Sequence, residues 1–279
     1  MKQKIKAFAL RNVPQVALHL LSVRSRKHAQ RYYARSGHAE IGKRIADRYG
    51  DRVLSGPFEG IRLPDESFKE HLAPYLLGVY EAELHAIWET LLAGNYRQVL
   101  DIGAKFGYYA LGIAACLPHS EVVAFDTDPW ARSVIAKASL MNDCRERTVI
   151  KGYCGPEWLR DHLQEDALIL SDCEGFESVL FDPKSISKLS SAVMVIETHD
   201  QEVIGVTNDL IERFAHSHVI TEIRNDESMR KSPVDLGFLS ENEQRIAISD
   251  LRPDQSWLVM LPRTGAHAWY SDPLVTTNS

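Results

Sequence analysis

The sequence predicts an α/β fold: a mostly parallel seven-stranded sheet with helices on both faces, preceded by a helical N-terminal extension. The main observation is strict alternation between residues 98 and 216, where short apolar runs of strand length are followed by longer helical patterns. The second is a glycine-containing turn directly after the first apolar run. At 279 residues the chain accommodates one large domain with an extension. We expect an extension over 1–70, the α/β domain over 71–265 and a tail over 266–279.

The individual elements follow from periodicity and from turn residues. A periodic stretch over 76–92 predicts one helix before the sheet, and Gly and Pro residues over 52–64 predict a small β-hairpin. Residues 225–250 read as an insertion before the last strand. Strands are expected near 98–102, 122–126, 147–151, 167–171, 192–197, 218–224 and 256–261, and helices near 107–117, 129–141, 155–164, 174–180 and 204–216.

The first 50 residues are basic and helical in pattern, in contrast to the acidic remainder. The apolar stretch 13–21 lies between basic residues as in a signal peptide, but it is short and contains His19. We expect a basic amphipathic helix that packs on the domain, on a partner chain as in a homodimer, or weakly on an anionic membrane. A terminal helix with a solvated charged face is the simpler alternative.

Composition limits the classes of partner. Lys and Arg number 32 against 38 Asp and Glu, a formal net charge of −6, which disfavours a nucleic-acid partner. The four cysteines, Cys116, Cys144, Cys154 and Cys173, form no Cys-x-x-Cys pair, so the expected compartment is the reducing cytoplasm. No apolar run reaches membrane-spanning length.

The glycine turn has the spacing Asp101-x-Gly103-x-x-x-Gly107, which differs from dinucleotide and nucleotide-triphosphate loops. Gly103 permits a tight turn close to a ligand, and Gly107 permits a helix to start close under the strand. The carboxylate of Asp101 would repel a pyrophosphate but suits an ammonium group, which S-adenosylmethionine carries. An ordinary strand-to-helix turn is the alternative.

An acidic residue ends the next strand, about 20 residues further on. In open α/β sheets, a carboxylate at this place binds a ribose diol. Asp126 occupies it, and Asp128 with Pro129 predicts the start of the following helix. Two features at the right separation favour a cofactor with a ribose.

Together these residues resemble motifs I and II of class I S-adenosylmethionine-dependent methyltransferases. The segments Asp172–Glu177 and Glu197–His199 resemble the Asp-x-Glu-Gly-x-Glu and Glu-x-His segments of FkbM-like members. The resemblance covers about residues 96–200 and implies a last strand that inserts antiparallel. Lys105 departs from the Ala-Asn that is common at Ala104-Lys105 in that group. The cofactor contacts that it implies are Asp101, Gly103, Ala104, Lys105, Phe106, Gly107, Asp126, Thr127, Tyr153, Cys154 and Asp172.

Catalytic groups are expected at the carboxyl ends of strands four and five, which meet in the same crevice. His199 is the preferred general base because its ordinary pKa lies nearest neutrality. Asp172 is the second choice, and it could instead hold the methionine ammonium or the acceptor hydroxyl; Glu174 is the third candidate. A strand-end histidine bonded to the backbone and a helix N-terminal acid are the alternatives for His199 and Glu174.

A divalent metal is compatible with Asp172, Glu197, His199 and Asp200, but no diagnostic spacing appears, so none is predicted. We expect O-methylation of a hydroxyl on a small molecule or a glycan, with the glycan implied only by the FkbM-like resemblance. A protein or RNA methyltransferase and a cofactor-binding module without catalysis are the alternatives.

Overall fold

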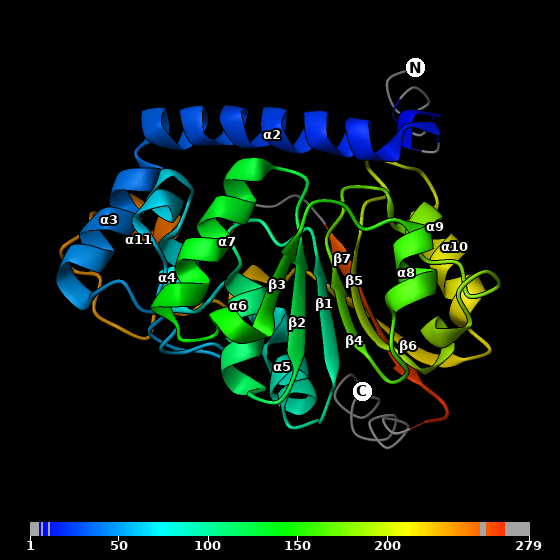
Figure 1. Ribbon diagram of the computed structural model, residues 1–279. Coiled ribbons are helices and arrows are strands. Elements are labelled where there is room, and N and C mark those ends of the chain that lie inside the picture. Colours follow the sequence, from blue (N-terminus) through cyan, green and yellow to red (C-terminus); the bar gives the residue numbers. More distant parts are fainter. Residues whose placement is uncertain (1–5, 7, 11, 252–254, 266–279) are drawn as a thin grey trace.

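A seven-stranded sheet forms the centre of the molecule. The computed structural model describes residues 6, 8–10, 12–251 and 255–265. The strand order is β3-β2-β1-β4-β5-β7-β6; the first five strands are parallel, and β7 runs antiparallel to both β5 and β6 (Figure 1). This confirms the predicted Rossmann-like sheet and its inserted last strand. The strands are β1 (Gln98–Ile102), β2 (Glu121–Phe125), β3 (Thr148–Lys151), β4 (Leu168–Ser171), β5 (Val193–Thr198), β6 (His218–Arg224) and β7 (Ser256–Pro262).

Helices cover both faces of the sheet because successive strand residues point to opposite sides. Val99 and Val122 belong to one buried apolar cluster, and their neighbours Leu100 and Val123 belong to the other. The first cluster includes residues of α5 (His85–Leu92), α6 (Tyr108–Cys116) and α7 (Pro129–Met141). The second includes residues of α8 (Pro156–His162), α9 (Glu177–Leu180) and α10 (Val206–Phe214). The predicted helices after each strand are therefore present, several of them shorter than expected.

The single helix predicted over 76–92 is wrong. The chain forms α4 (Ala73–Leu77), a short 3-10 turn (Ala82–Leu84) and then α5. Gly78 breaks the helix at φ 69°, where a Cβ would lie 1.8 Å from the carbonyl oxygen of Ser55. The Tyr80 ring is buried and stacks on Tyr75 at 3.8 Å between centroids, so it belongs to the core.

Two peripheral predictions are confirmed only in part. The hairpin over 52–64 consists of a single antiparallel bridge between Arg52 and Arg62. The 225–250 segment carries α11 (Glu241–Ile248), which begins with a capping box at Ser240. Its Arg230 is buried and forms an ion pair with Asp250, so this part of the insertion is anchored in the interior.

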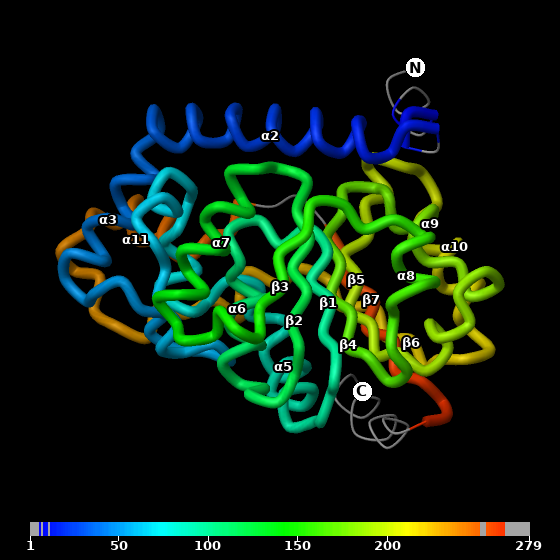
Figure 2. The backbone as a smooth tube through the Cα atoms, viewed as in Figure 1, coloured from blue at the N-terminus to red at the C-terminus, as the bar shows by residue number. Residues whose placement is uncertain are grey.

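The described part of the N-terminal extension includes α2 (Pro14–Ser36) and α3 (His38–Tyr49), which are separated by Gly37 at φ 81°. Figure 2 shows α2 running across the molecule above the ends of the central strands, and α3 beside α4 and α11. No helix within the described ranges is long and apolar enough to cross a membrane. The predicted tail 266–279 lies outside the described residues.

Candidate active site

A cavity of about 440 Å³ lies between the carboxyl ends of the strands and α2. Its floor comes from the loops after β1, β2, β3 and β4, the place where open α/β sheets bind ligands. Its roof comes from α2. The wall includes eight residues that the sequence singled out: Gly103, Lys105, Asp126, Thr127, Tyr153, Cys154, Asp172 and Glu174.

Gly103 brings the loops after β1 and β4 into contact. Its φ is 95°, and a Cβ on it would lie 1.8 Å from the backbone oxygen of Asp172. The Asp172 N–H donates to the carbonyl oxygen of Ile102 at 2.8 Å. The glycine is thus required by neighbouring backbone, and not by space for a ligand as expected. Gly107, at φ 90°, is the N-cap of α6.

Asp126 presents its carboxylate at the cavity wall. One oxygen accepts the N–H of Lys105 at 2.8 Å, and the other accepts the N–H of Asp128 at 2.7 Å. These bonds fix the carboxylate between the turn after β1 and the start of α7. Burial raises the pKa of Asp126 to about 7, partly offset by these two hydrogen bonds. The side chain therefore titrates near neutral pH.

Asp101 lies beneath the cavity and not on its wall, because it is only 3% exposed. Burial, together with the charges of Asp172 and Asp126, raises its pKa to about 8. Its Oδ2 atom has no hydrogen-bond partner within the described part of the chain. Ala104, Phe106 and Gly107 also lie off the wall and shape the turn.

Lys105 supplies a cation to the cavity. Its Nζ lies 5.6 Å from the ring centroid of Tyr75 and 5.4 Å from that of Phe106. Desolvation would lower the pKa of Lys105, but electrostatic interactions with Tyr75 and with the Glu70 carboxyl outweigh it and raise that pKa. Lys105, which stands where Asn is common in FkbM-like proteins, is therefore a charged group suited to a carboxylate.

His199 connects the loop after β4 to the end of β5. Its Nδ1 lies 2.8 Å from Glu177 Oε1, and its Nε2 lies 3.3 Å from Asp172 Oδ1. Burial alone would lower the pKa of His199, but these two carboxylates raise it to about 12. An imidazolium that is 2% exposed and bonded on both nitrogens does not suit the expected role of general base.

Asp172 is the carboxylate of this network that faces the cavity. Its side chain is 32% exposed, whereas those of His199 and Glu177 are buried. Burial opposes ionisation, but the hydrogen bond from His199 and a further one with Glu197 outweigh it and lower the pKa of Asp172. Asp172 is therefore an ionised acceptor held in place from behind.

Glu177 belongs to the same network, although no role was predicted for it from the sequence. Its Oε1 accepts the N–H groups of Cys173 and Gly175, each at 3.3 Å, besides contacting His199. It thereby fixes the turn in which Glu174 adopts φ 59° and Gly175 adopts φ 96°. The last acid of the Asp-x-Glu-Gly-x-Glu segment was the available sequence clue.

One group of residues has the spacing of a metal site. Ligand atoms of Asp172, Glu174 and His199 all lie within 4.8 Å of one another. Two members of the set considered from sequence fall outside this group. Glu197 is buried behind Asp172, and Asp200 accepts the N–H of Gly205 at 2.8 Å near the start of α10.

The wall after β3 is aromatic and apolar. Tyr153 lies near Phe176, with 6.0 Å between ring centroids. Burial raises the pKa of the Cys154 thiol and that of the Cys173 thiol, so neither is an activated nucleophile. This wall suits a flat, weakly polar group such as an adenine.

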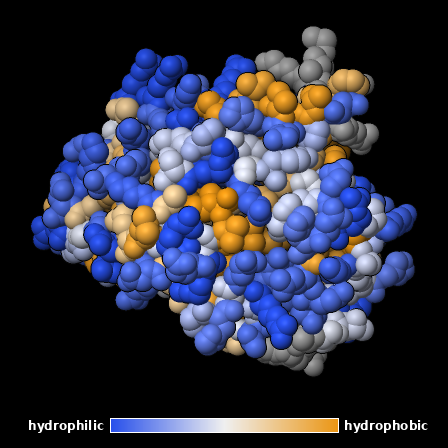
Figure 3. All heavy atoms as spheres, in the orientation of Figure 1, coloured by the Kyte–Doolittle hydropathy of each residue, from blue (hydrophilic) through white to orange (hydrophobic). Residues whose placement is uncertain are grey.

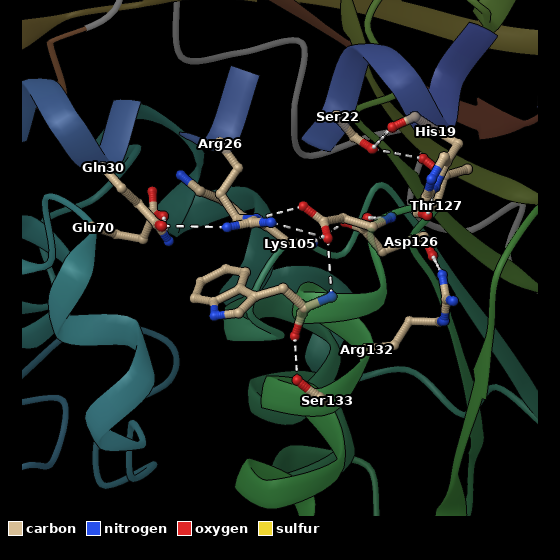
Figure 4. Close-up of polar contacts among 12 residues, drawn as sticks. His19, Ser22, Arg26, Gln30, Glu70, Lys105, Asp126, Thr127, Arg132 and Ser133 are labelled. Carbon is tan, nitrogen blue, oxygen red and sulfur yellow. Dashed lines mark hydrogen bonds and ion pairs between the residues drawn. The ribbon is translucent and has the colours of Figure 1, made fainter. Parts of the chain in front are cut away.

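The packing of α2 on the domain agrees with one of the expectations for the basic N-terminal helix, but its position over the cavity was not predicted. Figure 4 shows side chains of α2 pointing onto the loop after β2. The Arg26 Nε donates to Asp128 Oδ2 at 2.5 Å, and the guanidinium lies 5.0 Å from the Trp130 ring centroid. His19 donates to the Thr127 carbonyl oxygen at 2.8 Å, and Ser22 shares a hydrogen bond with the Thr127 hydroxyl at 2.9 Å.

Polar contacts also hold α2 near its C-terminal half and just before its N-terminus. Gln30 donates to Glu70 Oε1 at 2.7 Å, a contact that is visible in Figure 4. Lys6, before α2, pairs with Glu202 at 2.7 Å, in the loop after β5. Residues 40 and 196 positions apart in sequence are thus brought together, and α2 closes the cavity from above.

Comparisons with known proteins give distant likenesses. No protein-family model and no curated protein sequence matches the chain. Solved structures that are similar include a putative O-methyltransferase from Klebsiella pneumoniae (12% identity, 65% of this chain and 80% of that one, TM-score 0.44). A second is the O-methyltransferase TomG from Streptomyces achromogenes, in complex with SAM (14% identity, 65% of this chain and 79% of that one, TM-score 0.42). A third is an O-methyltransferase from Bacillus cereus, in complex with SAH (11% identity, 84% of this chain and 97% of that one, TM-score 0.43). At this level the likeness carries no argument about activity, which has to come from the site itself.

Proposed function

We propose that the protein is an S-adenosylmethionine-dependent methyltransferase that methylates a hydroxyl group on a small molecule or a glycan. The observation that carries the proposal is the cavity with Asp126 at the end of β2 and Asp172 at the end of β4. Its volume of about 440 Å³ lies within the range of small-molecule and cofactor sites. The glycan preference comes only from the FkbM-like resemblance.

The residues present fit this cofactor. Asp126 would accept the ribose hydroxyls, because its two oxygens are held at the wall and retain free lone pairs. Lys105 would pair with the methionine carboxylate, and Tyr153 with Phe176 would contact the adenine. When bound, the cofactor supplies a methyl group already activated by its sulfonium.

The chain has to align the acceptor and handle its proton. Asp172 would accept a hydrogen bond from the acceptor hydroxyl, because it is the ionised carboxylate on the wall. His199 is a positioning residue: it holds Asp172 from behind while Glu177 orients the imidazole. This replaces His199 by Asp172 as the preferred proton acceptor.

The test is calorimetric titration with S-adenosylhomocysteine. Micromolar binding is expected, and Asp126→Ala should weaken it about tenfold or more because the ribose contacts are lost. Asp161→Ala, which removes an exposed carboxylate elsewhere, is the matched control. Absence of binding by the unaltered protein would refute the proposed cofactor.

Turnover separates catalysis from binding. Asp172→Asn should keep S-adenosylhomocysteine affinity within a few fold and reduce methyl transfer from labelled S-adenosylmethionine to a panel of monosaccharides and catechols by about 100-fold or more. His199→Gln should shift the pH at which activity rises, because it removes the cation beside Asp172. Binding without transfer to any acceptor, including protein and RNA, would favour the module without catalysis.

A metal-assisted variant of this function rests on one observation, the proximity of Asp172, Glu174 and His199. Chelator added to the titration and to the transfer assay tests it. Loss of activity that returns with Mg²⁺ or Mn²⁺ would support a metal that binds the acceptor oxygens.

A further inference from the structure

Helix α2 has an inner face committed to the domain. His19, Ser22, Arg26 and Gln30 follow each other at spacings of three or four residues, and each hydrogen-bonds to the loop after β2 or to Glu70. Leu18 and Leu21 pack against the apolar core below. These contacts account for one side of the helix, and they leave its opposite side without a function in the cavity.

The opposite side of α2 is an exposed stripe that is apolar in its first half and basic in its second half. At 3.6 residues per turn, its six members fall within an arc of about 100°. All six are exposed: Val16 and Leu20 in the first half, and Arg24, Lys27, Arg31 and Arg35 in the second. We call this set the outer stripe of α2. A helix that only roofed a cavity would be expected to place polar residues on this side throughout.

The apolar half of the outer stripe is part of a larger exposed patch. Val16 is 60% exposed and Leu20 is 62% exposed, and Phe8 and Val13 just before the helix are 68% and 54% exposed. The ion pair between Lys6 and Glu202 holds the loop after β5 close to the segment before α2. This loop carries Ile204, which is 80% exposed. Figure 3 shows this apolar surface along the N-terminal half of α2. Contiguous exposed apolar surface of this kind marks an interaction site.

The basic half selects the partner by charge. Helix α2 contains no acidic residue, although the protein as a whole carries a formal net charge of −6. Four outward cations therefore face an anionic partner. A nucleic acid would satisfy the cations but would leave Val16 and Leu20 in water, whereas an anionic lipid interface accommodates both halves.

We propose that α2 docks in the plane of an anionic membrane surface. The apolar half inserts Val16, Leu20 and the flanking Phe8 among the acyl chains, and the basic half pairs with lipid phosphates. The cavity lies under the same helix, on the side that faces away from the lipid. This inference does not depend on a bound cofactor or on methyl transfer, so it can be tested independently of the proposed function.

The experiment is flotation of the full chain with vesicles. Vesicles of phosphatidylcholine alone are compared with vesicles that contain about one third phosphatidylglycerol, at low salt and at about 0.5 M NaCl. We expect binding to the anionic vesicles only, with a large loss at high salt. The quadruple variant Arg24→Gln/Lys27→Gln/Arg31→Gln/Arg35→Gln should bind about 100-fold more weakly.

Matched variants separate the outer stripe from general charge and hydrophobicity. Arg97→Gln/Lys184→Gln/Lys231→Gln/Arg245→Gln removes the same charge from exposed sites elsewhere and should bind as the unaltered protein does. Val16→Ser/Leu20→Ser should weaken binding about tenfold, whereas Leu140→Ser/Met229→Ser, at exposed positions away from α2, should not. Circular dichroism confirms that each variant is folded.

Three results with vesicles would overturn the proposal. They are equal binding to neutral and anionic vesicles, equal losses in the stripe and control variants, and absence of vesicle binding. Tighter binding of a labelled RNA duplex than of anionic vesicles would also overturn it, because the apolar half would then have no role.

Discussion

At the scale of single residues, the site depends on positions whose surroundings are fixed by distant backbone. Gly103 is the clearest case, since the turn after β1 meets the loop after β4 at this residue. Asp126 and Asp172 are two carboxylates on one wall with opposite behaviour: burial raises the pKa of the first, and hydrogen bonding lowers that of the second. At neutral pH the Asp172 carboxyl is therefore ionised, whereas the Asp126 carboxyl is only partly so.

Gly103→Ala should destabilise the fold by more than about 3 kcal/mol, because the new Cβ would overlap the Asp172 oxygen at a positive φ. Gly205→Ala is the control: its φ of 85° is similar, but nothing lies within 4 Å of the Cβ position, so about 1 kcal/mol is expected. Urea unfolding measures both values. Equal losses would show that the contact with Asp172 has no consequence.

Cofactor affinity should rise with pH through about 7. Because the pKa of Asp126 is raised to about 7, part of the free protein carries a protonated carboxyl below that pH. Ribose hydroxyls donate best to the ionised form, so binding lowers the pKa and releases a proton. Titrations with S-adenosylhomocysteine at pH values on both sides of 7, in buffers of different ionisation enthalpy, measure this release. Asp126→Asn should abolish the pH dependence; its persistence would assign it to another group.

At the scale of elements, α2 is the part that turns an open crevice into a closed cavity. Polar contacts and apolar packing both attach it, and the ion pair of Arg26 with Asp128 is more buried than that of Lys6 with Glu202. The Asp128 carboxylate also caps α7 by accepting the N–H of Trp130 at 2.9 Å. Loss of the pair would therefore affect the roof and the first turn of α7 together.

Arg26→Gln should loosen α2, because a charge-assisted pair of this burial is worth about 1–3 kcal/mol. Amide hydrogen exchange in 14–36 should become faster, and S-adenosylhomocysteine binding should weaken about tenfold. Arg31→Gln, on the outer stripe, should change neither quantity. Unchanged exchange in Arg26→Gln would show that other contacts hold the roof.

At the scale of the whole molecule, a buried ion-pair network joins the 225–250 segment to the chain before the sheet. Arg230 pairs with Asp250, and its Nη2 lies 3.6 Å from Glu83 Oε2. All three side chains are at most 5% exposed. The network is close to Glu81, whose carboxylate accepts a hydrogen bond from the Tyr109 hydroxyl.

Arg230→Met should destabilise the protein by about 3–5 kcal/mol, because it leaves buried carboxylates without their cation. Adding Asp250→Leu should recover part of this loss, since the unpaired charge is removed as well. Thermal unfolding of the two variants measures the difference. A double variant less stable than the single one would contradict this explanation.

The sequence by itself determined the sheet and the position of the candidate site. Apolar runs bounded by turn residues gave every strand to within about two residues, because strand burial requires such runs locally. The glycine turn and the acid at the end of the second strand were recognisable because their spacing along the chain sets their geometry. Such short motifs can be recognised without knowledge of the rest of the fold.

Only the tertiary structure decided how the site is closed and how its groups are charged. The roof by α2 depends on contacts such as Arg26 with Asp128, across about 100 residues, and no local pattern encodes them. The broken helix at Gly78 and the closeness of Gly103 to Asp172 likewise depend on backbone from elsewhere. The role that we propose for His199 differs from the expected general base for the same reason. A histidine pKa is set by its neighbours, and Glu177 and Asp172 become neighbours of His199 only when β4 and β5 pair.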